Sequence, residues 1–293
     1  MKLGLQGVTV LVASGDDGVS GRSTRGNPAA CGFAPQFPAS SPHVTAVGAT
    51  QGPESGTPEV VCEADTAITN PPLITSGGGF SGVFAQPPWQ AAAVAAYLRS
   101  GVQLPPAGSY ATAGRAYPDV SAMGHSYPVV MAGSLYPVDG TSASAPTFSA
   151  IVAQLNAQRA AAGQPPLGFL NPALYSLNQT TNAFRDITEG GNRCGAVYSG
   201  TLYTCCPNGF LAFSGTCRRR PCMCPVTLTV RVRNKHVCRV GSGDWPGLSR
   251  ICPTERATWG TEAARSPGWH LLGHHWCALG GRLEVFVVSN CSV

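Results

Sequence analysis

A serine at the start of a predicted helix is the residue of this chain best suited to nucleophilic chemistry. Residues 140–146 read GTSASAP, and the apolar residues that follow recur with helical spacing. A hydroxyl in the first turn of a helix is exposed, and the free backbone N–H groups there favour a developing oxyanion. Ser142 is therefore the candidate nucleophile. The structural alternative is that Ser142 or Thr141 only caps the helix.

Asp16 is the second candidate, because it follows a run of apolar residues. Residues 8–13 (VTVLVA) predict a buried parallel strand, and residues 14–18 (SGDDG) predict a tight turn directly after it. Open α/β sheets bind ligands at the carboxyl ends of their strands, where Asp16 would lie. Asp-Asp-Gly is also ordinary turn chemistry, and we assign that structural role to Asp17.

The elements that must position these residues alternate between strand and helix. Apolar runs at 44–48, 60–61 and 127–132 predict short strands, whereas residues 88–99 and a segment from Ser142 to about residue 162 predict helices. The expected fold is therefore α/β, with a mainly parallel sheet flanked by helices. Residues 76–81 (SGGGFS) are expected to be irregular, since three successive glycines sustain neither a helix nor a strand.

The composition changes abruptly near residue 217. The chain has 293 residues and a net charge of +5. Residues 1–216 carry eight basic and ten acidic residues, a net −2, whereas residues 217–293 carry eleven basic and four acidic residues, a net +7. We therefore expect a folded domain over 1–216. Residues 217–293 are expected to be an unrelated, poorly ordered tail rich in Cys and Arg, such as out-of-frame or read-through translation would produce.

Several classes of protein do not fit this sequence. A hydrophobic content of 43% excludes wholesale disorder. No apolar run approaches the ~20 residues needed to cross a bilayer, so no membrane partner is expected. The first residues lack the apolar region and cleavage site of a signal peptide. The basic residues of the tail have no helical periodicity and its Cys and His residues fit zinc spacing only loosely, so neither nucleic acid nor zinc is expected.

Five segments resemble the sedolisins, the serine-carboxyl peptidases, which are a branch of the subtilisin-like fold. The resemblance covers residues 1–216 and identifies them as the C-terminal part of a sedolisin-like peptidase domain. It implies hydrolysis of peptide bonds at acid pH through an acyl-enzyme on Ser142, by a tripeptidyl-peptidase or an endopeptidase. The segments occur in the family's order: 12–16 (VASGD), 76–81 (SGGGFS), 115–120 (RAYPDV), 140–146 (GTSASAP) and 165–172 (PPLGFLNP).

The resemblance also assigns roles to the candidate residues. Asp16 takes the place of the side chain that stabilises the oxyanion, and a carboxyl can donate there only while it is protonated, so its pKa must be raised or the pH low. A peptide substrate is expected to lie as an extra strand along the glycine-rich stretch. The residues of that stretch are Ser76, Gly77, Gly78 and Gly79.

The base that activates the serine differs from the usual histidine. Residues 1–216 contain only His43 and His125, and neither lies in a Gly-rich His motif. Sedolisins use a Glu supported by an Asp, and the resemblance puts this pair upstream of the first strand, before the chain begins. A Ser-His-Asp protease of the subtilisin type and a catalytically inactive fragment remain alternatives. One departure from the family is Asp139, where many members have Ser; a carboxylate there would alter local pKa values.

The resemblance implies one Ca²⁺ site near the end of the domain. Residues 184–190 (FRDITEG) match its first half, which makes the carboxylate of Asp186 and the main chain of Ile187 candidate ligands. Gly215 is a candidate carbonyl ligand. No Asp follows Gly215 where the family has one, so the site is expected to be incomplete.

The resemblance further implies the secretory pathway. A lysosomal or secreted protein, with disulfide bonds and a propeptide of its own, is the expectation. Because an odd number of cysteines precedes residue 217, at least one must be free or pair with the tail. These cysteines are Cys31, Cys62, Cys194, Cys205 and Cys206.

Overall fold

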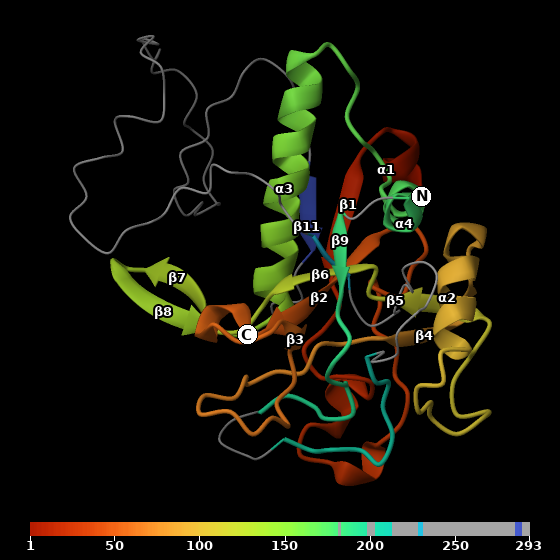
Figure 1. Ribbon diagram of the computed structural model, residues 1–293, viewed down its shortest axis with the longest axis vertical. Coiled ribbons are helices and arrows are strands. Elements are labelled where there is room, and N and C mark those ends of the chain that lie inside the picture. The colour runs from red at the N-terminus through yellow and green to blue at the C-terminus, as the bar shows by residue number, and fades with distance from the viewer. Residues whose placement is uncertain (181–182, 198–202, 213–227, 231–284, 289–293) are drawn as a thin grey trace, which may run out of the picture. The chain divides into compact units, whose positions relative to one another are not determined.

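The main element of the structure is a seven-stranded sheet (Figure 1). The protein is represented by a computed structural model, which describes residues 1–180, 183–197, 203–212, 228–230 and 285–288. The strands follow the order β11-β1-β2-β6-β10-β9, and β3 pairs with β2. Their bounds are β1 (Thr9–Ala13), β2 (Thr45–Gln51), β3 (Val60–Val61), β6 (Val120–Met123), β9 (Phe184–Asp186), β10 (Leu228–Val230) and β11 (Val285–Val288).

The sheet is mainly parallel, as the sequence predicts. Strands β11, β1, β2, β6 and β10 are parallel to their neighbours, whereas β3 and β9 are antiparallel. Leu11 of β1 pairs with Thr45 of β2, and Val47 of β2 pairs with Val120 of β6. All seven residues of β2 are buried, which explains its continuous run of small and apolar residues. The α/β class is therefore confirmed.

Helices cover the sheet. Phe148 and Val152 of the longest helix pack on Leu11, Val47 and Val120 in one hydrophobic cluster, and in Figure 1 this helix lies along the sheet. The predicted helix at 88–99 begins as a 3₁₀ turn before it becomes α-helical. The helices are α1 (Lys2–Leu5), α2 (Ala91–Leu98), α3 (Thr141–Ala161) and α4 (Asn171–Thr180), with 3₁₀ turns η1 (Gly21–Thr24), η2 (Pro28–Ala30), η3 (Pro53–Ser55) and η4 (Pro88–Gln90). None of the described helices is long and apolar enough to cross a membrane.

The prediction of irregular backbone over residues 76–81 is wrong from Gly79 onward. Strand β4 (Gly79–Ala85) pairs with β5 (Gly114–Tyr117) in an antiparallel ladder that starts at Gly79. Gly79 has a φ of +152°, which a glycine adopts without strain. Pairing with β5 therefore outweighs the weak strand propensity of Gly79. Residues 76–78 are irregular, as expected.

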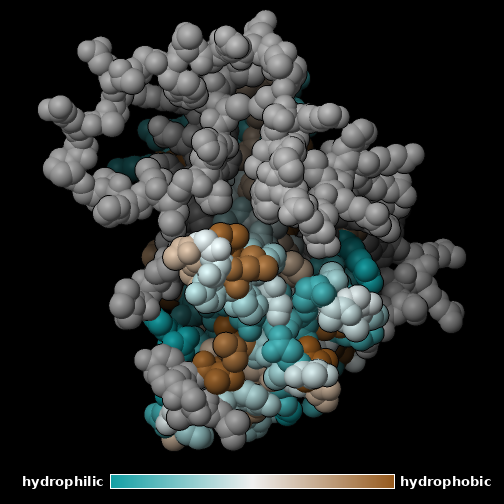
Figure 2. All heavy atoms as spheres, turned by 90° about the vertical axis from the view of Figure 1, so that its left-hand side faces the viewer, coloured by the Kyte–Doolittle hydropathy of each residue, from teal (hydrophilic) through white to brown (hydrophobic). Residues whose placement is uncertain are grey.

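The predicted strand at 127–132 exists, but it lies outside the main sheet. Strand β7 (Tyr127–Met131) pairs with β8 (Ser134–Val138) in a hairpin, which projects from the sheet in Figure 1. Val130 and Leu135 of this hairpin are 67% and 68% exposed. Figure 2, which views the molecule from the side of the hairpin, shows hydrophobic patches among hydrophilic residues. An apolar run therefore predicted the strand correctly but not its burial.

The domain boundary at residue 217 stays a prediction. Residues 213–227, 231–284 and 289–293 lie outside the described residues. Of residues 217–293, only strands β10 and β11 are described, and both pair with strands of the main sheet.

Candidate active site

One cavity, with a volume of about 60 Å³, brings the two main candidates together. Its wall contains both Asp16, which follows β1, and Ser142, which lies in the first turn of α3. The two residues are 126 positions apart in the chain and meet because α3 begins at the carboxyl end of the parallel sheet. The cavity is lined by Val12, Ala13, Gly15, Asp16, Asp17, Arg22, Arg25, Gln36, Phe37, Pro38, Ala39, Thr141 and Ser142.

The carboxyl of Asp16 is oriented by the residue next to the candidate nucleophile. Its Oδ1 accepts hydrogen bonds from the backbone N–H and from the hydroxyl of Thr141, each 2.8 Å long. The same hydroxyl accepts a bond from the N–H of Gly15 at 3.2 Å. Burial raises the pKa of the Asp16 carboxyl above its usual value, although the two bonds from Thr141 act in the opposite direction. The bonds from Thr141 therefore fix the carboxyl, and burial favours its neutral form.

Ser142 is held at the helix entrance without acting as its cap. The N-cap residue of α3 is Gly140, and no side chain caps the helix. A Cβ placed on Gly140 would lie 3.7 Å from the Cβ of Ser142 and 3.8 Å from Oδ2 of Asp16. A side chain at position 140 would therefore contact both Ser142 and the second oxygen of Asp16. Neither Thr141 nor Ser142 caps α3. The Thr141 hydroxyl donates to Asp16 instead, and Ser142 faces the cavity.

Asp17 does more than form a turn. Its side chain is 4% exposed, and both of its oxygens bind the guanidinium of Arg25, with Nε–Oδ1 at 2.6 Å and Nη2–Oδ2 at 2.8 Å. Such a two-pronged contact is the strong form of an Arg–carboxylate pair. Arg25 directly follows η1, so this pair ties the η1 turn to the end of β1. The sequence gives no signal for it, because the two residues meet only through tertiary structure.

The glycine-rich stretch lies beside the strand ends but does not line the cavity. Gly77 donates its N–H to the carbonyl of Gly15 at 2.7 Å, and a Cβ on Gly77 would lie 2.6 Å from the carbonyl of Ser14. A Cβ on Gly78 would lie 3.0 Å from the carbonyl of Tyr117. Close approach of backbone to backbone within the protein therefore already requires these glycines. Substrate binding by residues 76–79 stays a prediction.

The buried histidine belongs to a different cluster. His125 is 3% exposed, and its Nδ1 lies 2.9 Å from Oδ1 of Asp139. Asp139 also accepts the N–H groups of Ser126 and Leu73. The part of the cavity wall that the structure describes contains no histidine. His125 and Asp139 therefore brace the base of the β7–β8 hairpin, just before Gly140.

The candidate metal ligands are described only in part. Oδ1 of Asp186 is buried and has no hydrogen-bond partner in the described part of the chain, and burial raises the pKa of this carboxyl to about 6. Ile187 is fully buried. Gly215 lies outside the described residues. A carboxylate oxygen and a main-chain carbonyl are oxygen donors of the type that Ca²⁺ prefers, so Asp186 and Ile187 fit part of a Ca²⁺ site.

Two disulfides and one free thiol account for the five cysteines before residue 217. Cys31 pairs with Cys206 and Cys194 pairs with Cys205. Cys62 is free and buried. Disulfide bonding is therefore confirmed, and so is the expectation that an odd cysteine remains unpaired in this part of the chain.

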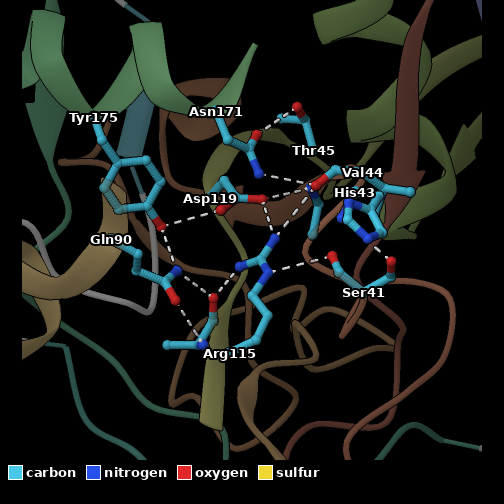
Figure 3. Close-up of polar contacts among 11 residues, drawn as sticks. Ser41, His43, Val44, Thr45, Gln90, Arg115, Asp119, Asn171 and Tyr175 are labelled. Atoms are coloured by element: carbon cyan, nitrogen blue, oxygen red, sulfur yellow. Dashed lines mark hydrogen bonds and ion pairs between the residues drawn. The ribbon is translucent and has the colours of Figure 1, made fainter. Parts of the chain in front are cut away.

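A buried polar network surrounds Arg115 (Figure 3). Arg115 is fully buried, and its Nη2 lies 2.5 Å from Oδ2 of Asp119. Oδ1 of Asp119 accepts the hydroxyl of Tyr175 at 3.0 Å, and that hydroxyl accepts Nε2 of Gln90 at 2.7 Å. The network joins β5, η4, α4 and the residue just before β6. The motif at 115–120 carried the family resemblance without an assigned role, and its role in the structure is this packing.

The comparisons with known proteins point to one family. No protein-family model matches the chain. Physarolisin from Physarum polycephalum is 42% identical over 211 residues, which covers 66% of this chain and 37% of that protein. Tripeptidyl-peptidase 1 of Mus musculus is 44% identical over 198 residues, covering 65% and 32%. Tripeptidyl-peptidase sed1 of Aspergillus fumigatus is 40% identical over 211 residues, covering 66% and 32%.

A solved structure gives a further likeness. It is a Pseudomonas sedolisin, a serine-carboxyl proteinase complexed with two molecules of pseudo-iodotyrostatin, and it is 27% identical with a TM-score of 0.49, covering 72% of this chain and 54% of that one. The chain spans about a third of the length of the curated relatives that it matches. The resemblance seen in the sequence is confirmed: over about two thirds of its length, the chain is similar to sedolisin-type serine-carboxyl peptidases.

Proposed function

We propose that this chain carries the nucleophile and the oxyanion-stabilising acid of a peptidase that hydrolyses peptide bonds at acid pH. The observation that carries the proposal is the common cavity of Ser142 and Asp16, in which Thr141 fixes the Asp16 carboxyl. The relatives named tripeptidyl-peptidase support an enzyme that releases tripeptides, with endopeptidase activity as the other possibility within the family.

The chemistry follows from the positions of the two side chains. The Ser142 oxygen attacks the carbonyl carbon of a peptide, so a C–O bond forms and the carbonyl oxygen gains negative charge. Protonated Asp16 donates a hydrogen bond to that oxygen, and the positive end of α3 adds to its stabilisation. Collapse of the intermediate expels the amine and leaves an acyl-enzyme, which water then hydrolyses.

The proton of Ser142 needs a base that still accepts protons in acid. A carboxylate meets this condition, whereas an imidazole would be protonated. The family resemblance assigns this step to a Glu supported by an Asp, upstream of the matched residues. The raised pKa of Asp16 supports a donor role in acid, where this carboxyl holds a proton.

We also propose that Asp186 and the main chain of Ile187 hold a Ca²⁺ ion. The support is the buried, unpartnered Oδ1 of Asp186, which a cation would satisfy. A bound Ca²⁺ would supply positive charge that stabilises the ionised carboxylate and ties β9 to the segment after it. An acidic compartment of the secretory pathway, lysosomal or extracellular, agrees with two disulfide bonds and with acid-dependent chemistry.

Active-site labelling tests the proposed function. The full-length gene product, which would include the Glu and Asp assigned upstream, is treated with a fluorophosphonate between about pH 4 and pH 7, and the modified residue is identified by mass spectrometry. Labelling of Ser142 that is fastest in acid supports the proposal. Labelling that is fastest near neutral pH would favour a Ser-His-Asp protease, and absence of labelling at every pH would favour an inactive member of the family.

A further inference from the structure

A charged pair lies directly beside the proposed oxyanion-stabilising acid. Asp17 is the next residue after Asp16, and its buried carboxylate forms two hydrogen bonds with Arg25. A third bond comes from the N–H of Ala196, at 3.4 Å from Oδ1. Asp16, Asp17, Arg25 and Ser142 all line the same cavity. The pair is therefore held by the fold within the surroundings of the reacting groups.

The two members of the pair act on Asp16 in opposite directions. The negative charge of Asp17 disfavours a second negative charge on Asp16 and so raises the pKa of Asp16, whereas the positive charge of Arg25 lowers it. Both effects are smaller than that of burial. With the pair intact, the two charges oppose one another at Asp16. Removing either member alone would leave one charge uncompensated.

We infer that Arg25 and Asp17 are positioning residues that set the pH range over which Asp16 carries the proton needed for oxyanion stabilisation. This inference rests on the proposed function, because it assumes that Asp16 acts as a proton-bearing donor. Neither residue needs to touch the substrate. Arg25 compensates the charge of Asp17, and through Asp17 it sets the upper pH limit of activity.

Within the described cavity wall, Arg22 is a further charged side chain beside this pair. Thr141 and Ser142 of α3 and the wall segment 36–39 contribute no ionisable side chain to the cavity. Cys62 is a thiol whose pKa burial raises well above its usual value, so it is neutral. The charged or titratable side chains that face Asp16 in the described structure are Asp17, Arg22, Arg25 and Cys62.

Carboxyl ¹³C NMR titration tests the inference without any need for turnover. The full chain is labelled at the Asp side-chain carbons, and Asp16→Asn assigns the Asp16 resonance. We expect Arg25→Gln to raise the titration midpoint of Asp16 by about 1 pH unit and Asp17→Asn to lower it by a similar amount. The double variant should return close to the unsubstituted chain. Arg99→Gln removes one positive charge from an exposed site outside the cavity and should leave the midpoint unchanged.

Opposite shifts in the two single variants are the essential result. Shifts of the same sign, or no shift in variants whose spectra show a folded chain, would overturn the inference. If Arg25→Gln does not fold, Asp17→Asn and the double variant still decide, because only a compensating pair makes the second substitution reverse the first. The inference also predicts that the upper pH limit of fluorophosphonate labelling moves with the midpoint.

Failure of the inference differs from failure of the proposed function. If the proposed function is wrong, Ser142 is labelled fastest near neutral pH or not at any pH, whatever the midpoint of Asp16. If only the inference is wrong, Ser142 is labelled in acid and the single variants titrate at Asp16 like the unsubstituted chain.

Discussion

Thr141 donates two hydrogen bonds to a single oxygen of Asp16, one from its backbone N–H and one from its hydroxyl, each of 2.8 Å. Both bonds reach Oδ1, so Oδ1 is an acceptor and a proton on this carboxyl belongs on Oδ2. Oδ2 is the oxygen that lies near Gly140, next to Ser142. The two bonds therefore decide which oxygen of the carboxyl is available as a donor to a substrate.

Asp16→Asn tests the role of Asp16 as a hydrogen-bond donor separately from its charge. The amide oxygen of Asn would accept both bonds from Thr141, which would put its NH₂ group where Oδ2 lies. We expect Asp16→Asn to retain labelling of Ser142 and to lose the decline toward neutral pH that deprotonation of Asp16 causes. Asp16→Ala removes the donor and should slow labelling about 10²–10³-fold. Equal rates for Ala and Asn would contradict the donor role.

Ser142→Ala should abolish labelling while leaving stability almost unchanged. Its hydroxyl does not cap α3, and small changes away from the core usually alter the free energy of unfolding by less than about 0.5 kcal/mol. Urea unfolding measures the stability. Ser144→Ala is the matched control, since Ser144 is buried two residues later and donates to the carbonyl of Met123. Labelling that persists in Ser142→Ala would show that another residue is the nucleophile.

Ca²⁺ should stabilise the chain through Asp186. We expect millimolar CaCl₂ to raise the melting temperature at pH 7, and the increase should be lost in Asp186→Asn. The effect should weaken below about pH 6, because protonation of a carboxyl with a pKa of about 6 competes with the cation. Exposed Glu189→Gln serves as the control and should retain the response. Identical responses of Asp186→Asn and the unsubstituted chain would remove Asp186 from the site.

Glu63 should make the folded chain more stable in acid than at neutral pH. Burial raises the pKa of Glu63 to about 7, although one of its oxygens accepts the N–H of Gly191 at 3.0 Å. A raised pKa in the folded state gives stability that is fully present below the unfolded pKa and is lost as the pH rises through about 7. Glu63→Gln keeps an acceptor for Gly191 and should flatten the pH dependence of urea unfolding, whereas Glu189→Gln should not.

The buried network around Arg115 should be sensitive to loss of a single partner. Arg115→Met leaves the carboxylate of Asp119 buried without its cation, and we expect a loss of about 3–5 kcal/mol in the free energy of unfolding. Tyr175→Phe removes one hydroxyl from the same network and should cost about 1–3 kcal/mol. Arg99→Gln, at an exposed position, is the control. Surface substitutions usually change the free energy of unfolding by less than about 0.5 kcal/mol. A change that small in Arg115→Met would argue against the ion pair.

The central elements could be predicted from local patterns. The apolar run at 8–13 and the helical spacing after Ser142 each indicate one buried element, and β1 and α3 have nearly those bounds. The order of the five matched segments then indicated that Asp16 and Ser142 belong to one site. These features could be predicted because strand periodicity, helix periodicity and the position of a strand end are properties of short segments.

Features that depend on partners could not be predicted. The last glycine of residues 76–79 enters a strand only because β5 pairs with it. The hairpin at 127–138 has an apolar sequence but few neighbours, so its burial could not be inferred from composition. The Asp17–Arg25 pair likewise arises from the placement of the η1 turn against the end of β1.

The Cys31–Cys206 bridge has a practical consequence for obtaining the protein. It closes a loop of 175 positions, and a loop of that size restricts the unfolded chain by about 5 kcal/mol. In the reducing cytosol of a bacterium the bridge would not form, and its contribution to the free energy of unfolding would be lost. That contribution is similar in size to the whole free energy of unfolding of a typical domain. The choice of an oxidising host therefore decides whether folded material is recovered at all.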